Sequence, residues 1–421
     1  MIPLELEVLE PLGRLHAAPW ADAVTGVEID SRRVEEGDLF VAVNGREFVK
    51  HALARGAAAA LEPDDAFAAL AAIGSAVRDR SPVRVVGITG STGKTSTKDI
   101  LASLCRSRAR TVAAEASFNN ELGVPLTLCR LETDTEVCIV ELGMRGIGQI
   151  AALCKIARPE IGVITKIAPV HLELLGSLEN VARSKAEVVD ALPPGGVAVV
   201  PDDAPELEPF LVRTDVEVRR FGRPLAWDVE GDGARGSFDV NGRAIRLELN
   251  LTGRHQARNV LAALYAYDAL GLPLEDGSVE LTLSRWRGEE VPLPGGGLLV
   301  NDSYNANPVS MRAALEHLAD RAGERRRVAI LGDMAELGPG GPEFHREVGR
   351  SLQELGVQEL VAVGELARGY VDGARGVPSH WVATAREAVA LVPSVVRPGD
   401  AVLVKGSRAV GLEVVAENLV S

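Results

Sequence analysis

The residues best suited to chemistry lie in a glycine-rich loop that follows a short β-branched run. Residues 82–98 read PVRVVGITGSTGKTSTK. A strand would deliver the chain, the glycines would let backbone N–H groups turn toward an anion, and the next helix would present its positive N-terminus. The pattern predicts that a nucleoside polyphosphate is bound by Gly90, Ser91, Thr92, Gly93, Lys94, Thr95 and Ser96.

Two side chains of this loop have separate expected roles. Lys94 would reach the β- and γ-phosphates, and the Thr95 hydroxyl would bind magnesium. The spacing departs from the general GxxxxGK[ST] pattern, because Ile88 stands where that pattern requires its first glycine. An accidental glycine-rich turn is disfavoured, because the amphipathic run DILASLCRS follows at once.

Two further segments could complete a site for a metal-bound triphosphate. A strand of buried type ends in Glu141, whose carboxylate would face the phosphates across the top of a parallel sheet, although a strand-end glutamate can also point to water. His171 follows the next strand, and Lys185 lies on the helix after it. A lone histidine in a loop is more often a hydrogen-bonded residue than a ligand, so His171 alone decides nothing.

Polar turns and helix faces add weaker candidates. Asn119 and Asn120 precede Gly123 in the segment ASFNNELGVP and could donate to phosphate or substrate, although turn chemistry alone also selects asparagine. His255 and Asn259 are four residues apart on one expected helix and would share a face. That face could meet an adenine edge or simply be hydrated.

The last third of the chain offers polar loops at strand ends. NDSYNANP lies between a strand and a helix, and its Asp302 suits a ribose hydroxyl, whereas Tyr304, Asn305 and Asn307 suit a nucleotide or phosphate. A plain polar loop is the alternative. The loops GDMAELG and KGSR would open on the same side of a parallel sheet, where Lys405 and Arg408 could bind a substrate carboxylate.

Composition limits the class of protein. At 421 residues the chain exceeds one ordinary core, and its 46% hydrophobic content excludes a disordered protein. No apolar run is long enough to cross a bilayer, and MIPLELEVLEPLGRL lacks the features of a signal peptide, so a cytoplasmic protein is expected. A net charge of −14 argues against nucleic acid as a partner. Free core thiols, without a metal, are expected at Cys105, Cys129, Cys138 and Cys154.

The elements that must position these residues predict an α/β fold of three domains. Residues 1–82 hold short strands and an alanine-rich helix, which predicts a small α/β domain. Residues 83–294 alternate apolar strands with helices, as in a mostly parallel doubly wound sheet with the phosphate loop at its first strand-to-helix turn. The same rhythm restarts in residues 295–421 and predicts a Rossmann-like domain.

Taken together, the motifs resemble those of the Mur ligases, ATP-dependent amide-forming enzymes of bacterial peptidoglycan synthesis. TGSTGKT is similar to the short phosphate loop of this family, and the resemblance extends over all three domains, including GDLFVAVNG near the N-terminus. FNNELGVP, GDMAELG, DSYNANP and KGSR are similar to the member that adds D-alanyl-D-alanine to UDP-N-acetylmuramoyl-tripeptide. The resemblance implies small-molecule substrates, ATP, Mg²⁺ and a UDP-binding N-terminal domain. A monomer is expected, although the sequence leaves the oligomeric state open.

The resemblance also implies a role for each matching residue. Magnesium is implied at Thr95, Glu141 and His171, and Lys185 matches a position where related ligases carry a carbamylated lysine that holds magnesium. The implied nucleotide contacts, besides the loop, are Asn259 for adenine, Arg287 for phosphates and Asp302 for ribose, with Tyr304 and Asn307 nearby. The implied substrate contacts are Ser31 and Arg32 for UDP, Asn119 and Asn120, and Lys405 and Arg408 for the dipeptide.

Three positions depart from the family pattern. Gln256 stands in place of asparagine, Trp286 in place of the glycine before the nucleotide arginine, and residues 49–51 in place of DGH. The first two adjoin nucleotide contacts, and the third leaves the UDP-side loop open. None touches the phosphate loop or Glu141.

The expected mechanism is activation of a carboxylate by ATP. The tripeptide carboxylate would attack the γ-phosphate, and the amine of the dipeptide would then attack the acyl phosphate. An ATPase or kinase without amide formation, and a non-catalytic nucleotide-binding module, are the alternatives from other classes. A GTPase is disfavoured because the chain has no NKxD motif. Within the family, the ligase that adds a diamino acid to UDP-N-acetylmuramoyl-dipeptide is the runner-up.

Overall fold

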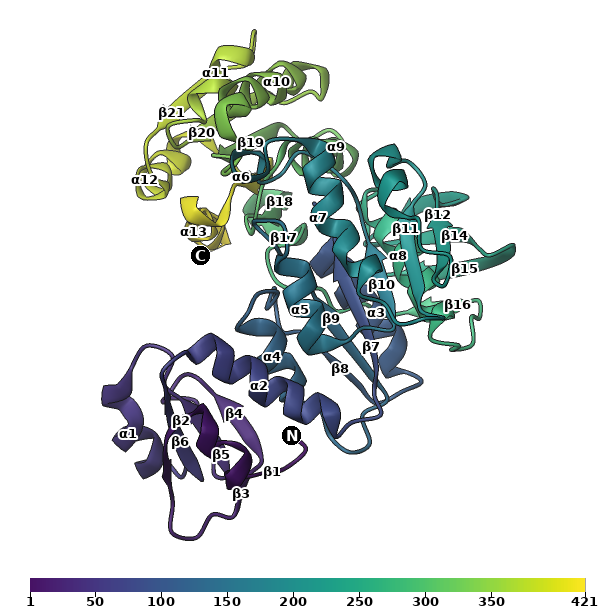
Figure 1. Cartoon of the computed structure of the whole chain (residues 1–421). Helices are drawn as coiled ribbons and strands as arrows, with labels where there is room; N and C mark the ends of the chain where they lie inside the picture. Colours follow the sequence, from purple (N-terminus) through teal and green to yellow (C-terminus); the bar gives the residue numbers. More distant parts are fainter. Residues whose placement is uncertain (421) are drawn as a thin grey trace.

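The computed structural model describes residues 1–420 and divides the chain into three α/β units that follow one another along an arc (Figure 1). The first unit has a four-stranded sheet of order β2-β6-β5-β4 and a separate β1-β3 pair. Its elements are β1 (Leu4–Glu5), β2 (Gly13–Ala17), β3 (Ala23–Val24), β4 (Gly26–Glu28), β5 (Asp38–Val41), α1 (Val49–Ala54), β6 (Ala59–Pro63) and α2 (Ala66–Asp79).

Helix α2 joins the first unit to the second. The Asp65 side chain caps its N-terminus by accepting from the amides of Phe67 and Ala68. Gly74 lets the helix approach the central unit closely, because a Cβ there would lie 2.9 Å from the Cα of Pro125. The apolar residues of α2 belong to the same hydrophobic core as the helices of the central unit, so the two units pack as one body along this face.

The central unit is built on a parallel six-stranded sheet of order β12-β11-β10-β7-β9-β8. After β7 the chain moves to one side of that strand and after β9 it crosses to the other, so the order reverses beside β7, where open parallel sheets bind ligands. The strands are β7 (Arg84–Thr89), β8 (Thr111–Ala113), β9 (Val137–Glu141), β10 (Ile161–Ile164), β11 (Val197–Pro201) and β12 (Glu217–Phe221).

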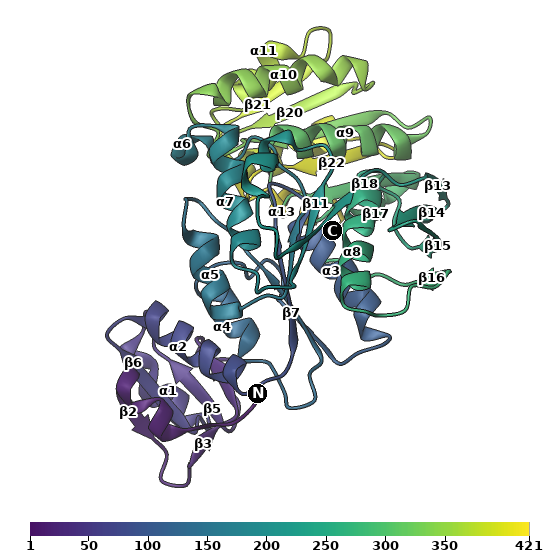
Figure 2. The same cartoon turned by 45° about the vertical axis from the view of Figure 1, so that its right-hand side comes forward.

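Helices cover both faces of this sheet, because its strands carry apolar side chains on both sides. Figure 2 shows α4, α5 and α7 on one face and α3 and α8 on the other. The helices are α3 (Lys94–Arg106), α4 (Gly123–Leu128), α5 (Gln149–Ala157), α6 (Leu172–Leu175), α7 (Leu178–Asp190) and α8 (Gln256–Ala269).

A second sheet in the central unit was not predicted from the sequence. Its order is β13-β14-β15-β16, and burial alternates along β14 and β15 as expected of half-buried strands. The two central strands are joined at Asn241-Gly242, which both adopt positive φ as in a type I′ hairpin turn. The Asn-Gly pair between alternating segments was the overlooked signal. The strands are β13 (Ala226–Glu230), β14 (Gly233–Val240), β15 (Arg243–Leu249) and β16 (Gly277–Val279).

The third unit has a six-stranded sheet of order β17-β18-β22-β19-β20-β21, in which only β17 runs antiparallel to its neighbour. The elements are β17 (Glu289–Leu293), β18 (Gly297–Asp302), α9 (Pro308–Ala322), β19 (Arg327–Gly332), α10 (Gly341–Glu354), β20 (Glu359–Val363), α11 (Arg368–Gly373), β21 (Ser379–Val382), α12 (Ala385–Val395), β22 (Ala401–Lys405) and α13 (Glu413–Val420). The α/β class, the parallel central sheet and the Rossmann-like third unit are thereby confirmed.

The predicted boundary at residue 294 falls inside the β17–β18 hairpin, so β17 belongs with the third sheet rather than the central unit. Because β17 is antiparallel, it begins at the edge of the sheet where β18 and β22 end. The connection from the central unit therefore enters the third unit at its carboxyl edge.

A buried ion cluster around Glu290 of β17 fixes the second unit against the third. Arg321 of α9 donates to both carboxylate oxygens, His317 lies 3.0 Å from one of them, and Thr252 of the central unit donates at 2.5 Å. Burial raises the pKa of Glu290, but these hydrogen bonds outweigh burial and hold it at about 2.

The four cysteines are free and buried, and burial raises the pKa of each thiol to about 12. They pack as small apolar residues, in line with the sequence expectation. None of the helices in residues 1–420 combines the length and the apolar character that crossing a bilayer requires.

Candidate active site

The phosphate loop connects β7 to α3 and is pressed against two neighbouring elements. Gly90 and Gly93 both have positive φ, at 149° and 83°. A Cβ on Gly90 would lie 1.9 Å from the hydroxyl of Thr165, which follows β10, and a Cβ on Gly93 would lie 2.4 Å from the Oδ1 atom of Asn259 on α8. Only glycine fits at either position, and the loop amides at the start of α3 stay open to an anion.

We expect Gly93→Ala to weaken ADP binding by at least about tenfold, because alanine in this backbone region is strained and its methyl group must displace Asn259. Gly195→Ala is the matched control, since its φ is 78° and its Cβ would meet nothing within 4 Å. Calorimetric titration with ADP compares the two variants. Equal ADP affinity for Gly93→Ala and the wild type would contradict the role of the loop.

Two side chains bind the carboxylate of Glu141 beside the phosphate loop. The Thr95 hydroxyl donates to its Oε2 atom at 2.8 Å, and the Asn119 amide donates to its Oε1 atom at 2.8 Å. The Glu141 side chain is buried, and Lys94 donates to the carbonyl oxygen of Gly90 at 2.8 Å. Burial lowers the pKa of Lys94, and the nearby Glu141 carboxylate opposes this shift.

The hydroxyl of Thr95 and the carboxylate of Glu141 fit a magnesium ion, because both offer oxygen atoms and lie close together. Residues 1–420 contain no cluster of three or more histidine, cysteine, aspartate or glutamate side chains that could enclose a metal by themselves. Magnesium commonly binds through one or two protein ligands, with water and substrate phosphates completing its shell. The residues present therefore suit this cofactor.

Arg287 brings the third unit to the loop. Its guanidinium donates to the Thr95 hydroxyl at 3.0 Å and lies 3.9 Å from the centre of the Tyr304 ring. The Tyr304 hydroxyl in turn contacts the Ser117 hydroxyl of the central unit. Residues predicted separately in the second and third domains are thus brought together.

Lys405 and Arg408 were expected to act together, and the structure separates them. Lys405 is buried and donates to Asp302 at 2.6 Å and to the carbonyl oxygen of Asn305 at 2.8 Å. The pairing arises because β18 and β22 are adjacent parallel strands that end with these two residues. Lys405 lines the cavity beside the phosphate loop, whereas Arg408 lines a different cavity.

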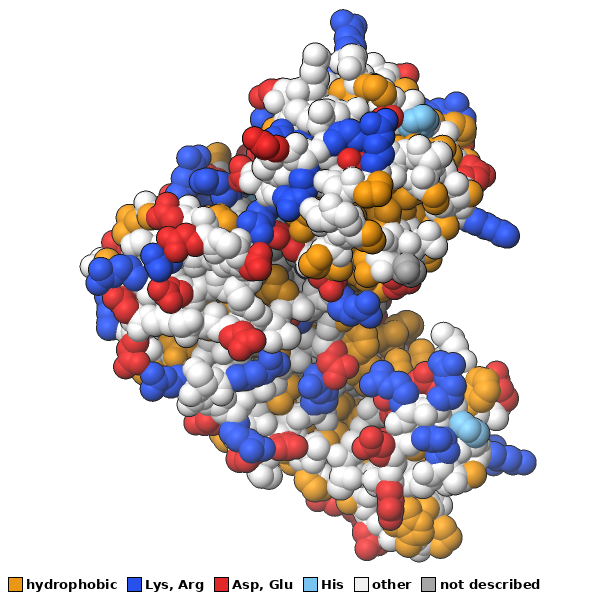
Figure 3. All heavy atoms as spheres, turned by 180° about the vertical axis from the view of Figure 1, so that it is seen from behind, with side chains coloured by type: hydrophobic (Ala, Val, Ile, Leu, Met, Phe, Trp, Pro, Cys, Tyr) orange, Lys and Arg blue, Asp and Glu red, His pale blue; other side chains and the backbone are white. Residues whose placement is uncertain are grey.

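Two adjoining cavities contain most of the candidate residues. The loop cavity, of about 690 Å³, lies between the second and third units. The three-unit cavity, of about 740 Å³, is lined by all three units, from Phe67 of α2 to Arg408. Figure 3 shows the surface hollowed between the lobe of the third unit and that of the first. Lys94 and Tyr304 line both cavities, so the two spaces meet at the end of the phosphate loop.

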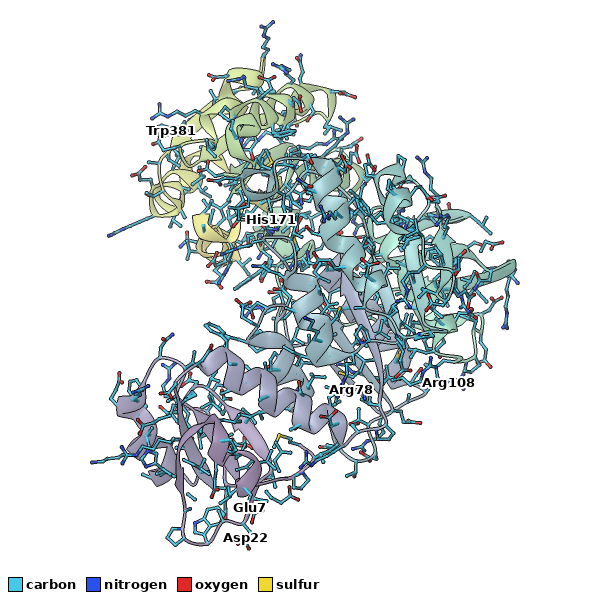
Figure 4. All side chains as sticks on the ribbon, viewed as in Figure 1. Glu7, Asp22, Arg78, Arg108, His171 and Trp381 are labelled. Atoms are coloured by element: carbon cyan, nitrogen blue, oxygen red, sulfur yellow. The ribbon has the colours of Figure 1, made fainter. Side chains whose placement is uncertain are left out.

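His171 and Lys185 both line the three-unit cavity. Figure 4 shows His171 close to the third unit. His171 contacts the carboxylate of Glu336, and burial lowers the pKa of the imidazole. The Lys185 side chain is buried, with only 2% of the residue exposed. Burial, with a contribution from Lys94, lowers the pKa of Lys185 well below its usual value, which favours the neutral amine.

Glu336 lies in the loop GDMAELG and was not predicted from the sequence as a site residue. Glu336 has a positive φ of 62° and reaches from the third unit to His171, and it also lies 3.4 Å from Arg145 of the central unit. A non-glycine residue in this conformation is uncommon and marks a constrained loop. Its partner lies 165 positions away in the chain, so no local pattern could reveal the pair.

Of the remaining candidates, two line the cavities and two lie in the first unit. Asn120 lines the three-unit cavity and also binds the amide of Gly123. Asn307 lines both cavities and caps α9. Ser31 and Arg32 lie in the first unit, outside the linings of both cavities, where Ser31 lies 3.1 Å from His51 and Arg32 pairs with Asp30 at 2.7 Å.

A short phosphate loop on a parallel sheet, facing a second sheet across a nucleotide-sized cavity, defines a multidomain P-loop nucleotide-binding protein. Residues 88–267 match the family model of the Mur ligase middle domain, and residues 286–408 match that of the Mur ligase glutamate ligase domain. The chain belongs to the Mur ligase family.

Similarity to individual relatives and solved structures supports this family assignment. The UDP-N-acetylmuramoyl-tripeptide--D-alanyl-D-alanine ligase of Synechocystis is 34% identical to the chain, over 94% of the chain and 92% of the relative. MurF from Acinetobacter baumannii has a TM-score of 0.86 and 28% identity, covering 99% of each chain. MurF from Thermotoga maritima in complex with ADP has a TM-score of 0.80 and 26% identity, covering 94% of this chain and 96% of its own.

Proposed function

We propose that the protein joins D-alanyl-D-alanine to UDP-N-acetylmuramoyl-tripeptide, consuming ATP and releasing UDP-N-acetylmuramoyl-pentapeptide, ADP and phosphate. The observation that carries the proposal is the pair of adjoining cavities that share Lys94 and Tyr304. A phosphoryl group could pass from a nucleotide in the loop cavity directly to an acid in the three-unit cavity, because the two cavities adjoin. The names of the relatives support the dipeptide as the amine.

The first chemical step is attack of the tripeptide carboxylate on the γ-phosphorus of ATP. The bond to ADP breaks, and an acyl phosphate forms. Lys94 and the amides at the start of α3 would bind the phosphate oxygens, and Arg287 would add positive charge from the third unit. Magnesium, when bound by Thr95 and Glu141, supplies further charge that offsets the developing negative charge on the phosphate oxygens.

The second step is attack of the free amine of the dipeptide on the carbonyl carbon of the acyl phosphate. A tetrahedral intermediate forms, the amine loses its proton, and phosphate leaves. The three-unit cavity would hold both peptides, with Asn119, Asn120 and Arg408 among their contacts. Ser31 and Arg32 would bind the UDP group on the first unit, which adjoins this cavity through Phe67 of α2.

The nucleotide would lie in the loop cavity. Asn259 would meet adenine, Asp302 the ribose, and Tyr304 and Asn307 the remaining polar groups. We reassign Lys405 to this cavity, where it orients Asp302. ATP is available in the cytoplasm, and a cytoplasmic location is part of the proposal.

His171 and Lys185 belong to a proposed second magnesium site. A free amine is a poor ligand for magnesium, whereas a carbamate formed from that amine and carbon dioxide would provide oxygen ligands. The neutral state that burial favours at Lys185 is the state that can react with carbon dioxide.

The test is a ligation assay with the purified protein, ATP, Mg²⁺, UDP-N-acetylmuramoyl-tripeptide and D-alanyl-D-alanine, with the product weighed by mass spectrometry. We expect the pentapeptide product, and we expect ADP release to require both the acid and the amine. ADP release without either would indicate an ATPase or kinase, and ATP binding without any turnover would indicate a non-catalytic module. Product formed only from a diamino acid and the dipeptide precursor would select the sister ligase.

A further inference from the structure

The segment between the second and third units carries a residue with an unusual backbone. Trp286 has a φ of 63°, and it stands where the family resemblance implies glycine. Glycine adopts this conformation without strain, whereas a bulky side chain in it is a genuine outlier. A strained backbone of this kind persists where the surrounding structure holds it in place, so the contacts of the Trp286 side chain are informative.

The Trp286 ring packs on Arg408. The guanidinium carbon of Arg408 lies 4.7 Å from the centre of the indole, within the range of a cation–π contact. Arg408 is also paired with Glu413 at 2.9 Å through one terminal nitrogen. Two neighbours therefore fix the guanidinium plane, while the side chain remains 51% exposed and lines the three-unit cavity. The other N–H groups of Arg408 stay available to a carboxylate.

Arg287, the next residue in the chain, links the contact between Trp286 and Arg408 to the nucleotide site. Arg287 lines the loop cavity and binds the Thr95 hydroxyl of the phosphate loop, so two consecutive residues contact Arg408 and the loop. The arrangement follows from topology, because β17 begins at the edge where β18 and β22 end. Because residues 286 and 287 are adjacent, their backbone links the position of Arg408 to that of the phosphate loop.

We propose that Trp286 is a positioning residue for the amine substrate, whose ring orients Arg408 toward the terminal carboxylate of the dipeptide. The inference rests on the proposed function and assigns that carboxylate to Arg408. Trp286 lies outside the linings of both cavities, so it acts through Arg408 rather than by touching substrate.

The experiment compares Michaelis constants in the ligation assay. We expect Trp286→Gly and Trp286→Leu to raise the KM for D-alanyl-D-alanine by roughly fivefold, the size of an exposed cation–π contact, with the KM for ATP changed by less than about twofold. Trp286→Phe retains a ring and should restore the KM to nearly the wild-type value. Trp286→Gly should melt no lower than the wild type, because glycine relieves the positive φ.

A second Trp–Arg pair provides a matched control. The guanidinium carbon of Arg368 lies 3.6 Å from the centre of the Trp381 ring, and neither residue lines either cavity. Figure 4 shows Trp381 in the third unit, apart from His171. Trp381→Leu removes the same kind of contact and should leave the KM for the dipeptide unchanged. Arg408→Met should raise that KM by about tenfold or more, and adding Trp286→Gly to it should have no further effect.

An unchanged dipeptide KM in Trp286→Gly, or effects of Trp286→Gly and Arg408→Met that multiply independently, would overturn the inference. So would an equal rise of the KM for all substrates with a lowered melting temperature, which indicates a merely structural role. Failure of the proposed function looks different, because the wild-type protein would then form no pentapeptide product at all.

Discussion

Lys94→Ala should lower kcat for ligation by about a thousandfold while the protein stays folded, because the positive charge at the end of the phosphate loop is lost. The amine of Lys94 now binds the carbonyl oxygen of Gly90 at 2.8 Å, at the place where the two cavities meet. A bound triphosphate would offer it a stronger, charged partner. Lys94 would then neutralise the phosphoryl group during transfer.

The measurement is steady-state ADP release together with product formation, with circular dichroism to verify folding. Lys155→Ala is the control, since Lys155 is an exposed lysine on α5 and should retain full activity. ADP affinity should fall less than kcat, because the loop amides still bind phosphate. Near-normal ligation by folded Lys94→Ala would remove Lys94 from the mechanism.

Glu141→Gln should lower kcat by about a hundredfold or more and shift the Mg²⁺ dependence to higher concentrations, because an amide binds the cation less well than a carboxylate does. The substitution keeps the size of the side chain. Both carboxylate oxygens of Glu141 accept a hydrogen bond, one from Thr95 and one from Asn119. The NH₂ group of glutamine would therefore replace an acceptor in either orientation of the amide. A loss of stability of about 1–3 kcal/mol is therefore expected as well.

A Mg²⁺ titration of ADP release separates the two effects, because saturating metal restores part of the activity lost through weaker binding but none of the stability. Glu132→Gln is the control, since the Glu132 side chain is 56% exposed and should tolerate the change. If Glu141→Gln showed the wild-type Mg²⁺ dependence, the carboxylate would have no part in holding the ion.

The sequence predicted well those elements that a short, contiguous segment encodes. The strand β7, the loop and α3 lie within one short segment, so their glycines, apolar run and lysine suffice to identify them. Most strands of the two large sheets were also recognised, because buried parallel strands are apolar runs bounded by turns. The hairpin at Asn241-Gly242 was overlooked although its signal was equally local.

Contacts between distant segments could not be predicted. Lys405 meets Asp302 because β22 inserts next to β18, and nothing in either strand encodes that order. Glu336 reaches His171 because two units pack together. The strained Trp286 was visible only as a departure from the family pattern, and its contact with Arg408 required the fold.

The packing of α2 against both the first and the central units has a consequence for how the protein unfolds. Its apolar face is interior surface for both the first and the central units, and Gly74 lets the backbone of Pro125 approach it closely. Heating should therefore melt these two units in one cooperative transition, rather than release the first as an independent body. A fragment ending near residue 82 would expose that face to water and would be prone to aggregate.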